Sequence, residues 1–102
     1  QRALFVDDRA VATDRAERAF SRAIELGHPD QERVAAFHLW RGRARDLAGR
    51  RALAESDYRL CLAHVADAPV HVAAKKGLKR PFTAVAAKRM HIEMSLGDVV
   101  QP

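Results

Sequence analysis

The sequence has little of what several protein classes require. It contains one cysteine, Cys61, in 102 residues, which excludes an internal disulfide framework. It has no apolar run near the roughly 20 residues that a membrane-spanning helix needs. Its N-terminus lacks the basic and apolar segments of a signal peptide. We therefore expect a cytoplasmic protein without membrane contact, and because the chain begins with Gln1 we expect that a segment precedes it.

The sequence also lacks the patterns that carry chemistry. A zinc site needs about four convergent nitrogen or sulfur ligands. No histidine pairs with another ligand at i, i+4, and Cys61 has no CxxC partner. Cys61 and His64 lie three residues apart, but a thiol at a core position is inert. Glycine-rich phosphate loops are absent. We expect no enzyme activity, no cofactor and no metal, and we expect the histidines to be scattered on the surface: His28, His38, His64, His71 and His91.

The composition is that of a folded domain, and its charge is uneven. Hydrophobic residues make up 48% and charged residues 30%. The formal net charge of +5 divides into −1 for residues 1–34, +2 for residues 35–68 and +4 for residues 69–102. A basic C-terminal third would suit an acidic partner, a nucleic acid or an anionic surface. A solvated surface is the simpler interpretation.

The spacing of apolar residues predicts an all-α fold of about five helices. The first covers residues 14–27, with Asp14 and Glu17 as a capping box and Gly27 as its end. Residues 1–12 are weakly patterned and form either an arm or a truncated helix.

Turn residues divide the rest of the chain. Asp30 caps the second helix, which Gly49 ends, and the third helix covers residues 51–65. The fourth covers residues 69–79, and the fifth about 81–96, with Pro81 in its first turn.

Each predicted helix has one apolar face, which we assign to the core. The second helix has Phe37, Trp40, Ala44 and Leu47; the third has Ala54, Tyr58, Cys61 and Val65; the fifth has Phe82, Val85, Ile92 and Leu96, beside Met90 and Met94.

Two of these helices carry the same packing pattern. At a constant offset of 38 residues, Ala16, Phe20, Ala23 and Ile24 match Ala54, Tyr58, Cys61 and Leu62. Small residues allow close helix approach, and the aromatic residue fills the gap between neighbouring hairpins. A repeat of this size predicts a stack of antiparallel helical hairpins.

The second and third helices resemble a tetratricopeptide repeat over residues 35–66. The resemblance rests on Gly42-Arg-Ala44, on Asp-Leu-Ala-Gly49-Arg50, and on Ala54, Tyr58 and Leu62. Residues 14–29 resemble the second helix of a preceding repeat. The chain departs from the family where His38, Arg41 and Arg45 replace the usual apolar or aromatic residues, and where Ala66 replaces a common proline.

The resemblance implies a single helical-repeat domain over residues 1–102, with a hairpin at 31–66. Helices within 69–97 either cap the stack or begin another repeat. It further implies a non-catalytic scaffold that binds a protein or peptide on the concave face of the first helices. The matching groove positions are Ala36, Leu39, Arg43 and Asp46. Arg43 would accept an acidic side chain. Because about three repeats are usually needed for a stable stack, we also expect either a longer protein or self-association.

Two questions about the basic residues stay open. Arg41, Arg43, Arg45, Arg50 and Arg51 either bind anions or form salt bridges with Asp46, Glu55 and Asp57. The alternative function is weak, non-specific nucleic-acid binding. The expected anion-binding residues are Arg50, Lys75, Lys76, Lys79 and Arg80, with Lys88 and Arg89 extending the row.

Overall fold

The protein is all-α over the residues that the structure describes. This computed structural model describes residues 2–86, and their side chains from residue 13 onward. The helices are α1 (Arg2–Leu26), α2 (Gln31–Leu47), α3 (Arg51–Ala63) and α4 (Ala68–Lys79). Residues 84–86 are helical as well, and residues 2–86 contain no strand. The all-α prediction is confirmed.

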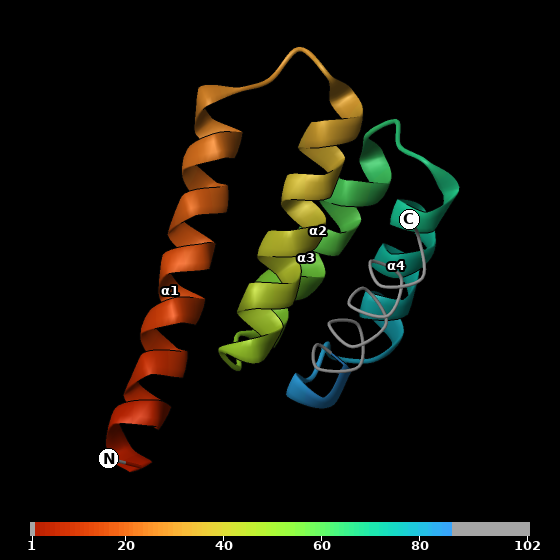
Figure 1. The fold of residues 1–102 in the computed structure, drawn as a ribbon. Helices are drawn as coiled ribbons and strands as arrows, with labels where there is room; N and C mark the ends of the chain where they lie inside the picture. Colours follow the sequence, from red (N-terminus) through yellow and green to blue (C-terminus); the bar gives the residue numbers. More distant parts are fainter. Residues whose placement is uncertain (1, 87–102) are drawn as a thin grey trace, which may run out of the picture.

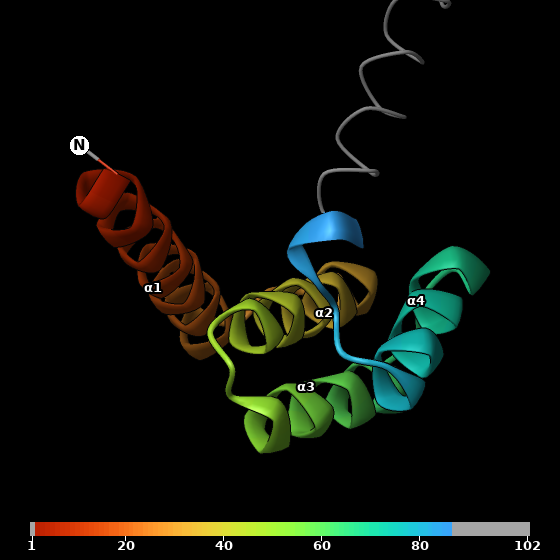
Figure 2. The same cartoon turned by 90° about the horizontal axis from the view of Figure 1, so that it is seen from below.

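The four helices run alternately up and down, and α2 lies at the centre (Figure 1). It packs against α1, α3 and α4. Seen from below, α1 and α4 flank α2, and α3 lies beneath it in the view (Figure 2). One side of α2 is therefore left uncovered by the other three helices. Within residues 2–86, no helix combines the length and apolar character needed to cross a membrane.

The predicted turn signals are confirmed at both ends of α2. Gly27 and Gly49 have φ angles of 77° and 79°, a conformation that L side chains rarely adopt. The side chain of Asp30 accepts a hydrogen bond from the Glu32 amide at 2.9 Å, so Asp30 caps α2. These local interactions fix where α1 ends, where α2 begins and ends, and where α3 begins.

The predicted start of the first helix is wrong. α1 begins at Arg2, so Asp14 and Glu17 lie inside it and do not form a capping box. Residues 1–26 contain neither glycine nor proline, and an aspartate alone does not interrupt a helix. The expectation of an arm over residues 1–12 is wrong for the same reason.

The fifth helix also starts later than predicted. Residues 81–83 are not helical, and Pro81 is therefore not in a first helical turn. Instead, Thr83 Oγ1 accepts a hydrogen bond from the Ala86 amide at 3.2 Å, as an N-cap residue does. Phe82 thus precedes the helix. The expectations for Lys88, Arg89, Met90, His91, Ile92, Met94 and Leu96 lie outside the described residues.

Tyr58 is the largest fully buried side chain. Its ring lies against two glycines, Gly42 on α2 and Gly77 on α4, where a Cβ atom would come within 2.7 and 2.6 Å of the ring. Tyr58 therefore joins α2, α3 and α4. Ala54 and Cys61, also on the predicted α3 face, are fully buried. Val65 is 72% exposed, because α3 ends at Ala63.

The predicted core face of α2 is partly wrong. Trp40 and Leu47 are 40% and 42% exposed, whereas Ala35, Leu39 and Gly42 are buried. Only at a glycine can α2 approach the Tyr58 ring so closely, so Gly42 decides which side of α2 faces α3. Trp40, two residues earlier, points about 200° away from it.

Candidate interaction surface on helix α2

Most arginines of the predicted set are used inside the molecule, around the buried carboxylate of Asp57. Asp57, on α3, is fully buried. Its Oδ1 lies 2.7 Å from Arg41 Nη2 and 3.0 Å from His38 Nδ1, and its Oδ2 lies 2.7 Å from Arg45 Nη1. All three partners belong to α2. The residues that depart from the family pattern thus form one buried polar cluster between α2 and α3.

The hydrogen bonds to Asp57 more than offset its burial. Burial alone would raise the pKa of the Asp57 carboxyl. Hydrogen bonds from His38 and Arg41, and the charges of Arg41 and Arg45, act in the opposite direction. The pKa of Asp57 is lowered from its ordinary value as a result. Asp57 is therefore a carboxylate at neutral pH and a structural one.

The same cluster extends to α1. Arg45 Nε lies 3.0 Å from Glu17 Oε1, and Arg41 Nη1 donates to Ser21 Oγ at 3.2 Å. Arg50 pairs with Glu17 and, at 3.4 Å, with Asp14. A hollow of about 300 Å³ beside this cluster is lined by Asp14, Glu17, Arg18, Ser21 and Arg50. Arg50, predicted as an anion-binding residue, is thus already paired with two carboxylates.

Arg51 is likewise engaged. Its Nη1 lies 3.0 Å from Asp46 Oδ2, and its Nη2 donates to the Leu78 carbonyl at 3.1 Å. A longer contact of 3.8 Å joins its Nε to Glu55. The salt-bridge interpretation is therefore correct for Arg41, Arg45 and Arg51, whereas Arg50 pairs with Glu17 and Asp14 rather than with the expected carboxylates.

Arg43 is the exception. Its guanidinium carbon lies 4.8 Å from the Trp40 ring centre and 4.7 Å from that of Phe82. Among residues 13–86, no carboxylate lies within ion-pair distance of it. Burial lowers the pKa of Arg43, while electrostatic interactions with Tyr58 and Cys61 raise it in part. A guanidinium nevertheless stays protonated in proteins. Arg43 is thus a cation held by two aromatic rings.

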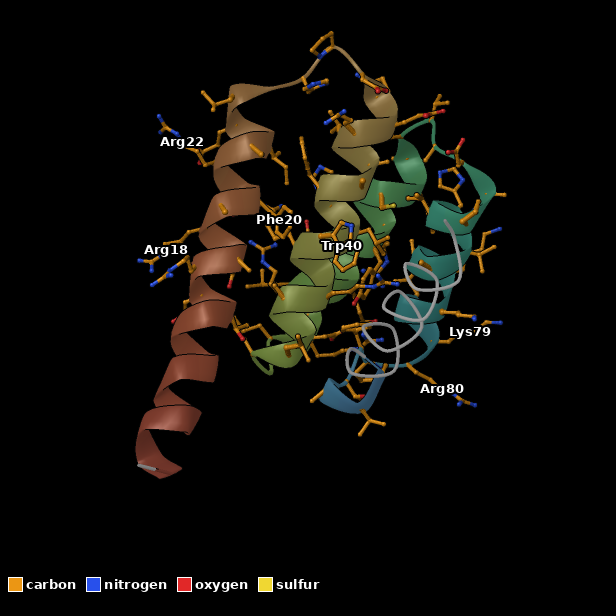
Figure 3. All side chains as sticks on the ribbon, viewed as in Figure 1. Arg18, Phe20, Arg22, Trp40, Lys79 and Arg80 are labelled. Atoms are coloured by element: carbon orange, nitrogen blue, oxygen red, sulfur yellow. The ribbon has the colours of Figure 1, made fainter. Side chains whose placement is uncertain are left out.

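We define the α2 face as the side of α2 that carries Ala36, Trp40, Arg43 and Leu47, which recur at i, i+4, i+7 and i+11. Trp40 lies on the side of α2 turned away from α3 (Figure 3). This face combines two exposed apolar side chains with one cation that lacks a carboxylate among the described residues. Such a combination suits a macromolecular partner.

Two of the four predicted groove residues lie on this face, and two do not. Ala36 and Arg43 are half-buried at the surface. Leu39 is 4% exposed and belongs to the core. The side chain of Asp46 is 1% exposed. The predictions of Leu39 and Asp46 as partner-binding residues are therefore wrong, because neither side chain is accessible.

Asp46 instead organises the region beneath Arg43. Its Oδ2 accepts hydrogen bonds from the Tyr58 hydroxyl at 2.6 Å and from the Phe82 amide at 2.9 Å, in addition to Arg51. Burial and the hydrogen bond to Asp46 raise the pKa of Tyr58 well above its ordinary value. The carboxylate thus links α2, α3 and the segment after α4.

Trp40 and Leu47 were missed as surface residues. Because both residues are large and apolar, the sequence predicts that they lie in the core. The signal that would have found them is Gly42, because a glycine in a helix that packs against an aromatic ring marks the covered side.

The predicted basic row on α4 is exposed. Lys75, Lys76, Lys79 and Arg80 are all exposed, and none of them forms an ion pair with another described residue. Lys79 and Arg80 project away from the helix bundle at the end of α4 (Figure 3). This surface is separate from the α2 face.

Three of the histidines, His38, His64 and His71, contact other protein groups near α2, α3 and α4. His38 is 5% exposed, so its assignment to the surface is wrong. Its ring stacks on that of His64, with the centres 5.6 Å apart. His64 Nδ1 lies 2.7 Å from Gln31 Oε1, and His71 Nε2 donates to the His64 carbonyl at 2.9 Å. Cys61 is buried, which raises its thiol pKa. These side chains hold helices together.

Comparison with protein-family models, with curated proteins and with solved structures found no match to this chain.

Proposed function

We propose that this chain is a non-catalytic, cytoplasmic protein-interaction module of the tetratricopeptide type, and that it binds a peptide or partner surface on the α2 face. One observation carries the proposal. Arg43 is the one member of the five-arginine set between positions 41 and 51 without a carboxylate among the described residues, and it lies beside the exposed ring of Trp40.

The chemistry of the α2 face supports this proposal. Tryptophan and arginine are enriched among the residues that dominate binding energy at protein interfaces. The ring stacking limits the rotamers of Arg43, so less side-chain entropy is lost on binding. The repeat assignment draws support from the antiparallel order of the helices and from the position of Tyr58 between α2 and α4.

The expected partner carries an acidic side chain. The Arg43 guanidinium contacts two aromatic rings and no carboxylate among the described residues, so its N–H groups remain for a ligand. A carboxylate fits these donors in a bidentate manner. Exposed Trp40 and Leu47 would contact apolar groups beside that carboxylate.

Selection from a random peptide library displayed on phage tests the proposal. Peptides that bind the wild-type protein are measured against Arg43→Glu and Trp40→Ala. The matched control is Arg22→Glu, which makes the same charge change at an exposed residue of α1 that points away from the α2 face (Figure 3). We expect Arg43→Glu to abolish binding, with a helical circular dichroism spectrum unchanged. Selected peptides that bind Arg43→Glu as well as the control would refute the α2 face as the binding surface.

The second candidate function is weak nucleic-acid binding through α4. It is favoured by the four exposed cations of Lys75, Lys76, Lys79 and Arg80. Engagement of phosphates would make log K fall with log salt, with a slope of about −0.9 per phosphate for duplex DNA. Simultaneous reversal of Lys75, Lys76 and Lys79 to Glu should abolish this binding and leave the selected peptides bound. Sequence-selective binding that survives high salt would make nucleic acid the primary ligand.

A further inference from the structure

The segment that follows α4 lies against the edge of the α2 face. After Lys79 the chain leaves α4 and turns back toward α2 (Figure 2). At Phe82 it makes two contacts with α2. The Phe82 amide donates to Asp46 Oδ2 at 2.9 Å, and the Phe82 ring lies 4.7 Å from the Arg43 guanidinium. A non-helical stretch of the chain thus binds α2 through one backbone N–H group and one aromatic ring.

The groups that receive Phe82 are held in place by other residues. The Asp46 carboxylate is oriented by the Tyr58 hydroxyl and by Arg51, both on α3. The Arg43 guanidinium is oriented by Trp40, whose ring centre lies 4.8 Å from the guanidinium carbon. The acceptor and the flat cation therefore belong to α2 and α3, and neither depends on the segment that occupies them.

The occupying segment is lightly held. Apart from Phe82, which is half-buried, residues 80–85 are exposed, and Val85 is 69% exposed. Among the described residues, the contacts of Phe82 with Asp46 and Arg43 are the ones that join residues 80–86 to α2. Exchange of this segment for a ligand with the same two features would leave the rest of the core unchanged.

We propose that the α2 face recognises an extended peptide with an aromatic side chain, which takes the place of Phe82 on Arg43 and donates a backbone N–H to Asp46. Residues 80–86 then act as an internal competitor of that peptide. This inference rests on the proposed function of the α2 face and adds the chemical class of the partner. The Arg43 edge stays available for a carboxylate of the same peptide.

The test uses a synthetic peptide with the sequence of residues 79–86 and blocked ends. It is titrated into the full chain with Phe82→Ala and into the wild-type chain. The reporter is the indole N–H resonance of Trp40, the only tryptophan in the sequence. We expect saturable binding to Phe82→Ala. Binding to the wild type should be about tenfold weaker or more, because a tethered segment competes at an effective millimolar concentration.

Three controls sharpen the result. A peptide with alanine in place of its phenylalanine should not bind. Val85→Ala changes an exposed side chain of the same segment, and its affinity should equal that of the wild type. Phe82→Leu keeps an apolar side chain and replaces Phe82→Ala if that variant does not fold. We expect Phe82→Leu, too, to bind the peptide more tightly than the wild type does.

Equal affinity for the wild type and for the folded Phe82 variants would overturn the inference. Equal binding of the alanine peptide, or no shift of the Trp40 resonance at millimolar peptide, would do the same. If such a result accompanies library peptides that depend on Arg43, the aromatic subsite is refuted and the proposed function stands. If the aromatic peptide binds as expected but library peptides ignore Arg43→Glu, the proposed function fails instead.

Discussion

Replacement of Tyr58 by alanine should nearly abolish the stability of the fold. The Tyr58 side chain is fully buried, and its ring contacts helices on both sides of α3. Truncation of a buried aromatic side chain to alanine costs about 3–5 kcal/mol. The cost depends on how far neighbouring side chains can fill the cavity. Here two of the nearest neighbours, Gly42 and Gly77, have no side chains to move, so we expect the upper part of this range.

Loss of the hydroxyl adds a second contribution. The Tyr58 hydroxyl donates to Asp46 at 2.6 Å, and a hydrogen bond to a charged group contributes about 1.5–3 kcal/mol. Asp46 retains Arg51 and the Phe82 amide, so the lower part of that range applies. The two contributions together approach the stability of a small domain, roughly 5–15 kcal/mol.

Urea denaturation followed by circular dichroism measures this effect. Tyr58→Phe separates the ring from the hydroxyl and should cost about 1–2 kcal/mol. Leu53→Ala, on the same helix, is the matched control, because Leu53 is 47% exposed and its truncation should cost less than about 1 kcal/mol. A loss below about 1 kcal/mol for Tyr58→Ala would mean that this residue does not join the helices, and the packing argument would then be wrong.

Four further outcomes follow from the ion pairs and the exposed faces. Asp57→Ala should cost about 3–5 kcal/mol in urea, because it leaves the half-buried Arg41 without a carboxylate and Arg45 with Glu17 alone. Asp57 has a lowered pKa in the folded state, so its stabilising effect is present above its unfolded pKa of about 3.9 and is lost as the pH falls through the folded pKa. Asp57→Asn should therefore flatten the pH dependence of the free energy of unfolding below about pH 4. Arg50→Gln should cost less than about 1 kcal/mol, since Arg50 is 45% exposed, and a larger loss would contradict its surface assignment. If the chain self-associates through an uncovered helix face, light scattering should give a mass that rises with concentration, and a constant monomer mass would exclude this.

The sequence was most informative where structure depends on neighbouring residues. Gly27 and Gly49 adopt positive φ angles, and Asp30 bonds to an amide two residues away. Such interactions need no knowledge of the rest of the fold. The repeated pattern around Tyr58 also predicted a core residue correctly, because the same spacing recurs on a second helix.

The sequence was least informative where one residue depends on distant partners. Arg41 and Arg45 look like surface residues by hydrophobic periodicity, yet both point toward Asp57, which is 16 and 12 residues away. A carboxylate and its hydrogen-bond donors are stable in the protein interior only when they are paired, so the burial of each depends on the other. Periodicity along one helix cannot show this.

The orientation of α2 was missed for a related reason. Trp40 is large and apolar, and Gly42 contributes nothing to a hydrophobic pattern. In the structure Gly42 is buried and Trp40 is exposed, because only the glycine side of α2 fits against the Tyr58 ring. The exposure of Trp40, and therefore the α2 face, depends on how α2 packs against α3.

The fluorescence emission of Trp40 tests most directly whether partners bind on the α2 face. Trp40 is the only tryptophan and is 40% exposed in the free protein. Its quenching by acrylamide is measured with and without a peptide selected for binding to the wild type. If the peptide covers the α2 face, the quenching constant should fall toward that of a buried indole. A saturating peptide that leaves the quenching of Trp40 unchanged would place the binding surface elsewhere and contradict the account.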